Sequence, residues 1–129
     1  MAGGQLVQVT RAGGSAGLES LEGKYIYYTK EPSRVGLFRM SVEGGEEKQV
    51  VPGNMFWKQF SISAKGVYFS TDGKAIQLLD AATGKVSTLT TLRGKDYFYP
   101  GSVSPDGAFL LSEHSDQITA DLMLVEGFR

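Results

Sequence analysis

The fold is decided by one stretch of the sequence, AKGVYFSTDGKAIQLLD at residues 64–80. It contains two apolar runs, Val67–Phe69 and Ile76–Leu79, on either side of the pair Asp72-Gly73. Asp-Gly is a pair that tight hairpin turns prefer, because glycine accepts the positive φ that such turns need. The stretch therefore predicts two antiparallel strands joined by a tight turn.

The same pattern of strand, turn and strand occurs three times along the 129 residues. A glycine closes the turn before the second strand of each unit, at Gly23, Gly66 and Gly107, and these glycines are 43 and 41 residues apart. A period of about 40–45 residues with four strands in each repeat is typical of the blades of a β-propeller. The sequence therefore predicts an all-β fold with three four-stranded antiparallel β-propeller blades in each chain.

The chain is predicted to be a single propeller segment over residues 1–129, with blades at about 15–52, 57–92 and 98–129. The third blade has no fourth strand of its own, but Gln5–Thr10 alternates polar and apolar residues as a half-buried strand does, and it is predicted to close the last blade. The strands expected within the blades lie, in chain order, at Gly17–Leu21, Lys24–Lys30, Gly36–Val42, Glu47–Val51, Gln59–Ser63, Gly66–Thr71, Ala75–Asp80, Val86–Thr91, Gly101–Ser104, Ala108–Glu113 and Ala120–Glu126.

The number of blades argues for an assembly. A propeller has about four to eight blades, and three twisted sheets cannot surround an axis. Three blades alone would also expose sheet faces and an unpaired strand edge, and both promote association. Two copies would supply six blades. The sequence therefore predicts a homodimer closed by strand exchange, in which Gln5–Thr10 of each copy pairs with Asp121–Glu126 of the other.

Composition excludes several classes of function. The formal net charge is −1 and the basic residues form no stripe, which argues against nucleic-acid binding. The absence of cysteine excludes disulfides and thiolate chemistry, and no apolar run is long enough to span a bilayer. The N-terminal sequence lacks a signal-peptide pattern, so the expected location is cytoplasmic for the chain as it stands, and periplasmic if it is part of a longer exported protein.

No convincing catalytic set is present. The single histidine, His114, has serines close by, but the members of a catalytic triad are brought together by the fold, and neighbours on a strand point to opposite faces. Glu113, Asp116 and Asp121 lack the regular spacing of a calcium loop, and one histidine without cysteine does not make a transition-metal site. We therefore predict no catalytic residue, no metal and no cofactor.

Two aromatic loops, at 55–60 and 96–100, precede the predicted inner strands of the second and third blades. In a propeller these loops share one face with the loops between the second and third strands. Aromatic and arginine side chains anchor protein and peptide interfaces. Core packing between blades is the alternative; it is favoured for Trp57 and Phe98, and both interpretations stay open for Tyr97 and Tyr99. The candidate binding residues on this face are Arg34, Trp57, Lys58, Tyr97, Tyr99 and His114.

The segment Ser102–Gly107 and the strand after it resemble the signature of the TolB-type, WD40-like propeller repeat. Lys65–Phe69 and Leu37–Gly45 are similar to the second and third strands of that repeat, and Asp121–Arg129 resembles the C-terminal blades of large acidobacterial propeller proteins. The first two units depart from the Pro-Asp-Gly turn that the family favours. The resemblance implies a sensing or scaffolding propeller.

The function expected from these observations is a non-enzymatic propeller module that binds or scaffolds a protein, a peptide or another ligand. One alternative is a hydrolase or lyase whose site forms at the ring centre or at a subunit boundary from Glu19, Asp72 and Asp106 of two copies. Another alternative is a fragment of a larger sensor or regulator protein.

Overall fold

The computed structural model describes residues 13–30, 36–55, 60–91, 97–115 and 120–126, with the side chains of 15, 97–101, 112–115, 120–123 and 125 left aside. Within these ranges the protein contains strands and turns and no helix. Every pair of neighbouring strands there is antiparallel. The predicted fold class is therefore confirmed at the level of an all-β protein with antiparallel sheets.

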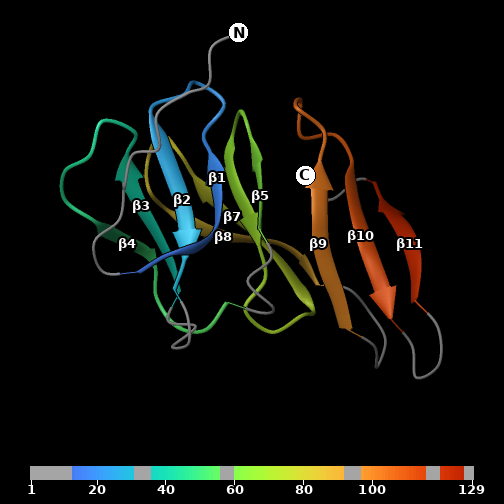
Figure 1. Cartoon of the computed structure of the whole chain (residues 1–129). Coiled ribbons are helices and arrows are strands. Elements are labelled where there is room, and N and C mark those ends of the chain that lie inside the picture. The colour runs from blue at the N-terminus through green and yellow to red at the C-terminus, as the bar shows by residue number, and fades with distance from the viewer. Residues whose placement is uncertain (1–12, 31–35, 56–59, 92–96, 116–119, 127–129) are drawn as a thin grey trace, which may run out of the picture.

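The strands form three sheets, each built from strands that follow one another in the sequence (Figure 1). The first sheet contains β1 (Ser15–Glu19), β2 (Tyr25–Thr29), β3 (Leu37–Ser41) and β4 (Lys48–Val51). The second sheet contains β5 (Phe60–Ser63), β6 (Gly66–Phe69), β7 (Ala75–Asp80) and β8 (Val86–Thr91). The third sheet contains β9 (Tyr97–Val103), β10 (Leu110–Ser115) and β11 (Ala120–Val125).

The start of β9 differs from the prediction. The sequence places this strand at Gly101–Ser104 and a loop at 96–100, but Tyr97–Pro100 already belong to β9, so the predicted loop is wrong for these residues. A register shift between Leu111 and Ser112 lets Pro100 stand opposite Ser112. Proline cannot donate to a ladder, and β9 tolerates it because this strand lies at the edge of its sheet.

The three sheets lie side by side, with the second sheet between the other two (Figure 1). Their first strands are neighbours, because β5 approaches both β1 and β9. The first strands of the three sheets therefore run along a common line. Within the described ranges no sheet closes on itself.

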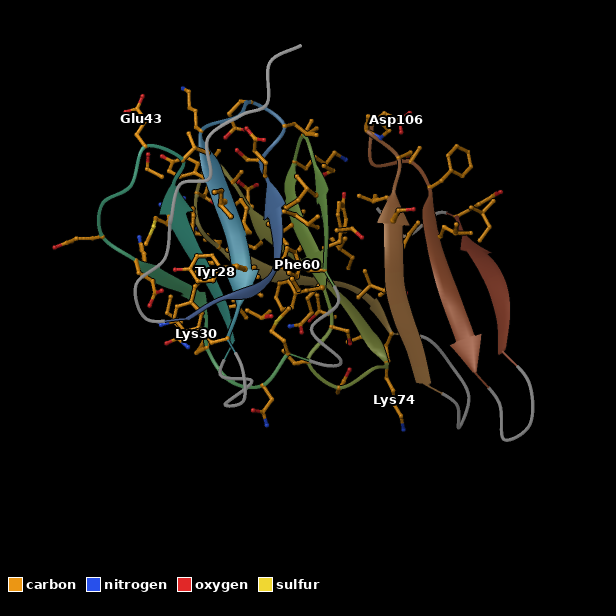
Figure 2. All side chains as sticks on the ribbon, viewed as in Figure 1. Tyr28, Lys30, Glu43, Phe60, Lys74 and Asp106 are labelled. Carbon is orange, nitrogen blue, oxygen red and sulfur yellow. The ribbon has the colours of Figure 1, made fainter. Side chains whose placement is uncertain are left out.

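The larger apolar core lies between the first and second sheets. Strand alternation explains its composition, since Tyr27 faces the second sheet while its neighbour Tyr28 faces the other way. Phe60 lies in this core, between the two sheets (Figure 2). The buried members are Tyr27, Leu37, Val51, Met55, Phe60, Val67, Phe69 and Leu79.

A smaller core joins the second and third sheets. Its buried members among the described side chains are Tyr68, Ile76 and Leu110, and Leu78, Leu89 and Val103 pack against them. Tyr68 lies between Val67 and Phe69 in β6 and points to the opposite face of the sheet, where its side chain is 1% exposed. Tyr68 is therefore a buried side chain of the second sheet that packs against the third.

A hydrogen-bonded turn recurs between the first two strands of the outer sheets. The Oγ of Ser20 accepts bonds from the backbone N–H groups of Lys24 and Tyr25, at 3.3 and 3.1 Å. The Oγ of Ser104 accepts the equivalent pair from Ala108 and Phe109, at 3.1 and 3.0 Å. In each turn the N–H of the glycine three residues after the serine donates to the serine carbonyl.

The corresponding serine of the second sheet is Ser63, three residues before Gly66. Its Oγ accepts one bond, from the backbone N–H of Lys65 at 3.1 Å. All three units thus share a serine and a glycine in the pattern Ser-x-x-Gly, and the first and third units also share the hydrogen bonds. The repeat is therefore visible in backbone geometry as well as in apolar pattern.

Candidate functional site

The predicted loop-face residues fall mostly where the structure gives no side-chain detail. Arg34, Trp57 and Lys58 lie outside the described residues. The backbones of Tyr97 and Tyr99 lie in β9, and His114 of β10 stands opposite Phe98, between these two tyrosines. The structure therefore brings three of the six candidate positions to one end of the third sheet, where β9 starts and β10 ends (Figure 1). Their role in binding stays a prediction.

Two carboxylates of the enzymatic alternative lie at opposite ends of the sheets. Asp106 is at the same end as Glu43, whereas Lys74, two residues after Asp72, is at the other end (Figure 2). Each carboxylate serves its own turn: Asp106 accepts bonds from the Ser104 hydroxyl at 2.7 Å and the Ala108 N–H at 3.0 Å. Within one chain these groups do not converge, and the described residues contain no cluster of three or more metal-ligand side chains.

Asp72 is bound in the same way by the turn between β6 and β7. Its Oδ1 accepts bonds from the N–H groups of Lys74 at 2.8 Å and Ala75 at 2.9 Å, and from the Ser70 hydroxyl at 3.3 Å. Burial raises the pKa of the Asp72 carboxyl, but these hydrogen bonds lower it by more, so the net pKa lies below its ordinary value. Since the folded pKa is the lower one, the carboxylate stabilises the folded protein above about pH 4, the unfolded pKa, and loses this effect as the pH falls through the folded pKa.

Replacing Asp72 with alanine is expected to lower the free energy of unfolding by about 1 kcal/mol near neutral pH, because two backbone donors lose their acceptor. The difference from the native protein should shrink as the pH falls through the lowered pKa of the native Asp72 carboxyl, because the native carboxyl is then protonated as well. Urea unfolding at neutral pH and at a series of acidic pH values measures this. Asp72→Asn keeps an acceptor oxygen and should lose less. A cost for Asp72→Ala that does not change with pH would contradict the assignment.

Among the described strands, the last strand of the third sheet has a partner on one side only. This sheet contains three strands where the other two sheets contain four, and β11 forms a ladder with β10 alone among the described strands. An edge of this kind presents a row of backbone N–H and C=O groups to any extended segment that approaches it. The predicted occupant, Gln5–Thr10 of a second copy, lies outside the described residues.

Three apolar side chains of the third sheet are exposed, two of them on its outer face. Leu111 and Leu124 stand opposite each other on β10 and β11, and they are 40% and 55% exposed. Phe109, two residues before Leu111, is 45% exposed, whereas Leu110 between them is fully buried on the inner face. We call Phe109, Leu111 and Leu124 the terminal apolar face. Together with the open edge of β11 it forms the candidate association surface.

The outer face of the first sheet, at the other end of the stack, is apolar too but shielded. Tyr28, Phe38 and Met40 are buried there, and the Tyr28 and Phe38 rings stack with centroids 6.0 Å apart. The Lys30 ammonium lies 4.5 Å from the Phe38 ring centre and pairs with the Glu47 carboxylate. These two ends of the stack therefore differ in chemistry.

The Tyr28 hydroxyl also donates to Glu47, so one carboxylate ties β2 to the residue before β4. Figure 2 shows Tyr28 and Lys30 close together on the first sheet. Burial, and then the Glu47 carboxylate, raise the pKa of Tyr28. Burial raises the pKa of Glu47, but the bonds from Lys30 and Tyr28 lower it by more, so Glu47 is held as the anion.

Comparison of this chain with models of known protein families found no match, and a search of curated proteins found no relative. Among the described residues there is no helix that could cross a membrane. In its described residues the protein is an all-β chain of three stacked antiparallel sheets, two with four strands and one, at the end of the stack, with three.

Proposed function

We propose that this chain is one half of a six-bladed β-propeller ring, closed by strand exchange between two copies, and that the ring is a non-enzymatic module for binding or scaffolding. One observation carries the proposal: among the described strands the third sheet has three where the other two sheets have four, and β11 pairs with β10 alone. The occupant of this edge is the segment Gln5–Thr10 of the second copy, whose alternating sequence suits an added strand.

The arrangement of the sheets supports the same proposal. Blades of a propeller place their first strands around the axis, and β1, β5 and β9 are neighbours along one line. The recurring Ser-x-x-Gly turn supports a repeat of equivalent units. In the ring the terminal apolar face of one copy lies against the first sheet of the other, which removes Leu111 and Leu124 from water.

The binding role rests on the absence of a converging catalytic set among the described residues. The carboxylates of Asp72 and Asp106 hold their own turns and lie at opposite ends of the sheets. The candidate loop face, with Tyr97, Tyr99 and His114 at one end of the third sheet, is the surface that this role would use.

Light scattering coupled to size exclusion tests the ring. The native chain is expected to show the mass of two copies, and Leu124→Asp the mass of one, because a buried charge opposite an apolar partner face would cost several kcal/mol. Leu21→Asp is the matched control, since Leu21 is 57% exposed in the turn after β1 and outside the terminal apolar face. A native chain that has the mass of one copy at every concentration would overturn the proposal.

A further inference from the structure

A polar cleft opens between the first and second sheets. Tyr27 of β2 pairs in register with Arg39 of β3, and Arg39 pairs with Lys48 of β4, so the three side chains form one row across neighbouring strands. The turn between β7 and β8, from Asp80 to Gly84, supplies the opposite wall. The cleft has a volume of about 250 Å³, which suits a small ion or metabolite rather than a protein segment.

The positive charges of Arg39 and Lys48 stand opposite each other on neighbouring strands, which costs the sheet stability. Like charges that stand directly opposite each other on neighbouring strands destabilise a sheet. The Arg39 guanidinium lies over the Tyr25 ring, 4.3 Å from its centre, a contact that attracts a cation to the ring face. Among the described residues, Lys30 and Glu47 form an ion pair. Within the same residues, neither Arg39 nor Lys48 has a carboxylate within 4.0 Å.

Asp80 is the one acidic residue among those that line the cleft, and its carboxylate accepts hydrogen bonds from the backbone of the turn. Its Oδ1 accepts bonds from the N–H groups of Ala82 at 2.8 Å and Thr83 at 3.0 Å. The wall therefore carries two positive charges and one negative charge that is already bound by backbone donors. The balance of charge favours an anionic guest.

We propose that this cleft binds a small organic dianion through a carboxylate or phosphate group held between Arg39 and Lys48. A guanidinium matches the paired oxygens of these groups, and such charge-assisted bonds are stronger than neutral ones. Lys48 adds the second positive charge. Both walls belong to one chain, so the site does not depend on the ring and goes beyond the proposed function.

The test is a calorimetric titration of the full chain with inorganic phosphate and, separately, with succinate. Saturable binding of at least one anion is expected for the native chain and for Lys65→Gln, a control at an exposed lysine in the turn between β5 and β6. Lys48→Gln should bind at least about tenfold more weakly, because one charge-assisted bond is lost. Binding of phosphate alone identifies a phosphate ester as the guest, binding of succinate alone identifies a dicarboxylate, and either result supports the site.

Asp80→Asn is expected to change anion binding in the opposite direction from Lys48→Gln. Asparagine keeps an oxygen that can accept from Ala82 and Thr83, but it removes the negative charge from the wall. Binding should become about threefold stronger, as expected for the loss of one like charge near the surface. The proposal is overturned if neither anion binds the native chain, or if Lys48→Gln and Lys65→Gln bind with equal strength.

Discussion

Replacing Gly66 with alanine is expected to lower the free energy of unfolding by about 3 kcal/mol or more, or to prevent folding, because the new Cβ has no room. Gly66 is the first residue of β6, where its φ is +143° and it stands opposite Asp80 of β7. A Cβ at this position would overlap the carbonyl oxygen of Leu79 and lie 2.9 Å from the backbone nitrogen of Ala81. Both are backbone atoms of the neighbouring segment, which cannot move without breaking the ladder.

Urea unfolding followed by circular dichroism measures this loss. The control is Gly84→Ala, since Gly84 has a φ of +73° but no atom within 4 Å of the added carbon. The control should lose only about 1–2 kcal/mol, the cost of the left-handed conformation itself. Equal losses in the two variants would show that close approach of the strands is not what position 66 requires.

Replacing Tyr68 with alanine is the second large effect, with an expected loss of about 3–5 kcal/mol. Tyr68 is 1% exposed and contacts the third sheet from the second, where the buried residues that accompany it are Ile76 and Leu110. Removing the ring leaves a cavity between the two sheets. The third sheet should therefore separate from the stack before the first two sheets do.

Hydrogen exchange resolves this prediction strand by strand. Amides of β10 should exchange much faster in Tyr68→Ala, while amides of β2 and β3 stay protected by the larger core. Phe109→Ala removes an aromatic ring of the same region that is 45% exposed, and it should cost less than about 1 kcal/mol. Equal acceleration in the first and third sheets would contradict the view that Tyr68 acts as the local anchor.

Hairpins were predictable from the sequence because their signals are local. The pair Asp72-Gly73 and the apolar runs around it predict β6 and β7 to within two residues. The start of β9 was missed because aromatic residues and Pro100 suggested a loop, whereas pairing with the distant strand β10 extends the strand through them. The serine of the Ser-x-x-Gly turn was a signal in all three units, but its role depends on backbone donors that only the folded turn brings near.

The association surface and the cleft were likewise predictable only in part from the sequence. Counting strands in the sequence predicts that the third unit has no fourth strand of its own; among the described strands β11 lies at the edge of its sheet, and the prediction for the whole chain stays a prediction. The sequence did not indicate that Leu124 faces solvent while Leu110 is buried, because alternation defines two faces without saying which one is covered. The row of Tyr27, Arg39 and Lys48 was also missed, since its members become neighbours only through the register of three strands.

The chemical difference between the two ends of the stack has a consequence for how copies could add to one another. Exposed leucines lie at one end and an aromatic layer with an ion pair at the other, so a contact between the two ends joins unlike surfaces. Contacts between unlike surfaces close into a ring only when the rotation that relates one chain to the next is 360° divided by a whole number. Otherwise the chains add without end and form a filament. The angle between the stacked sheets would then decide between a discrete particle and a fibre.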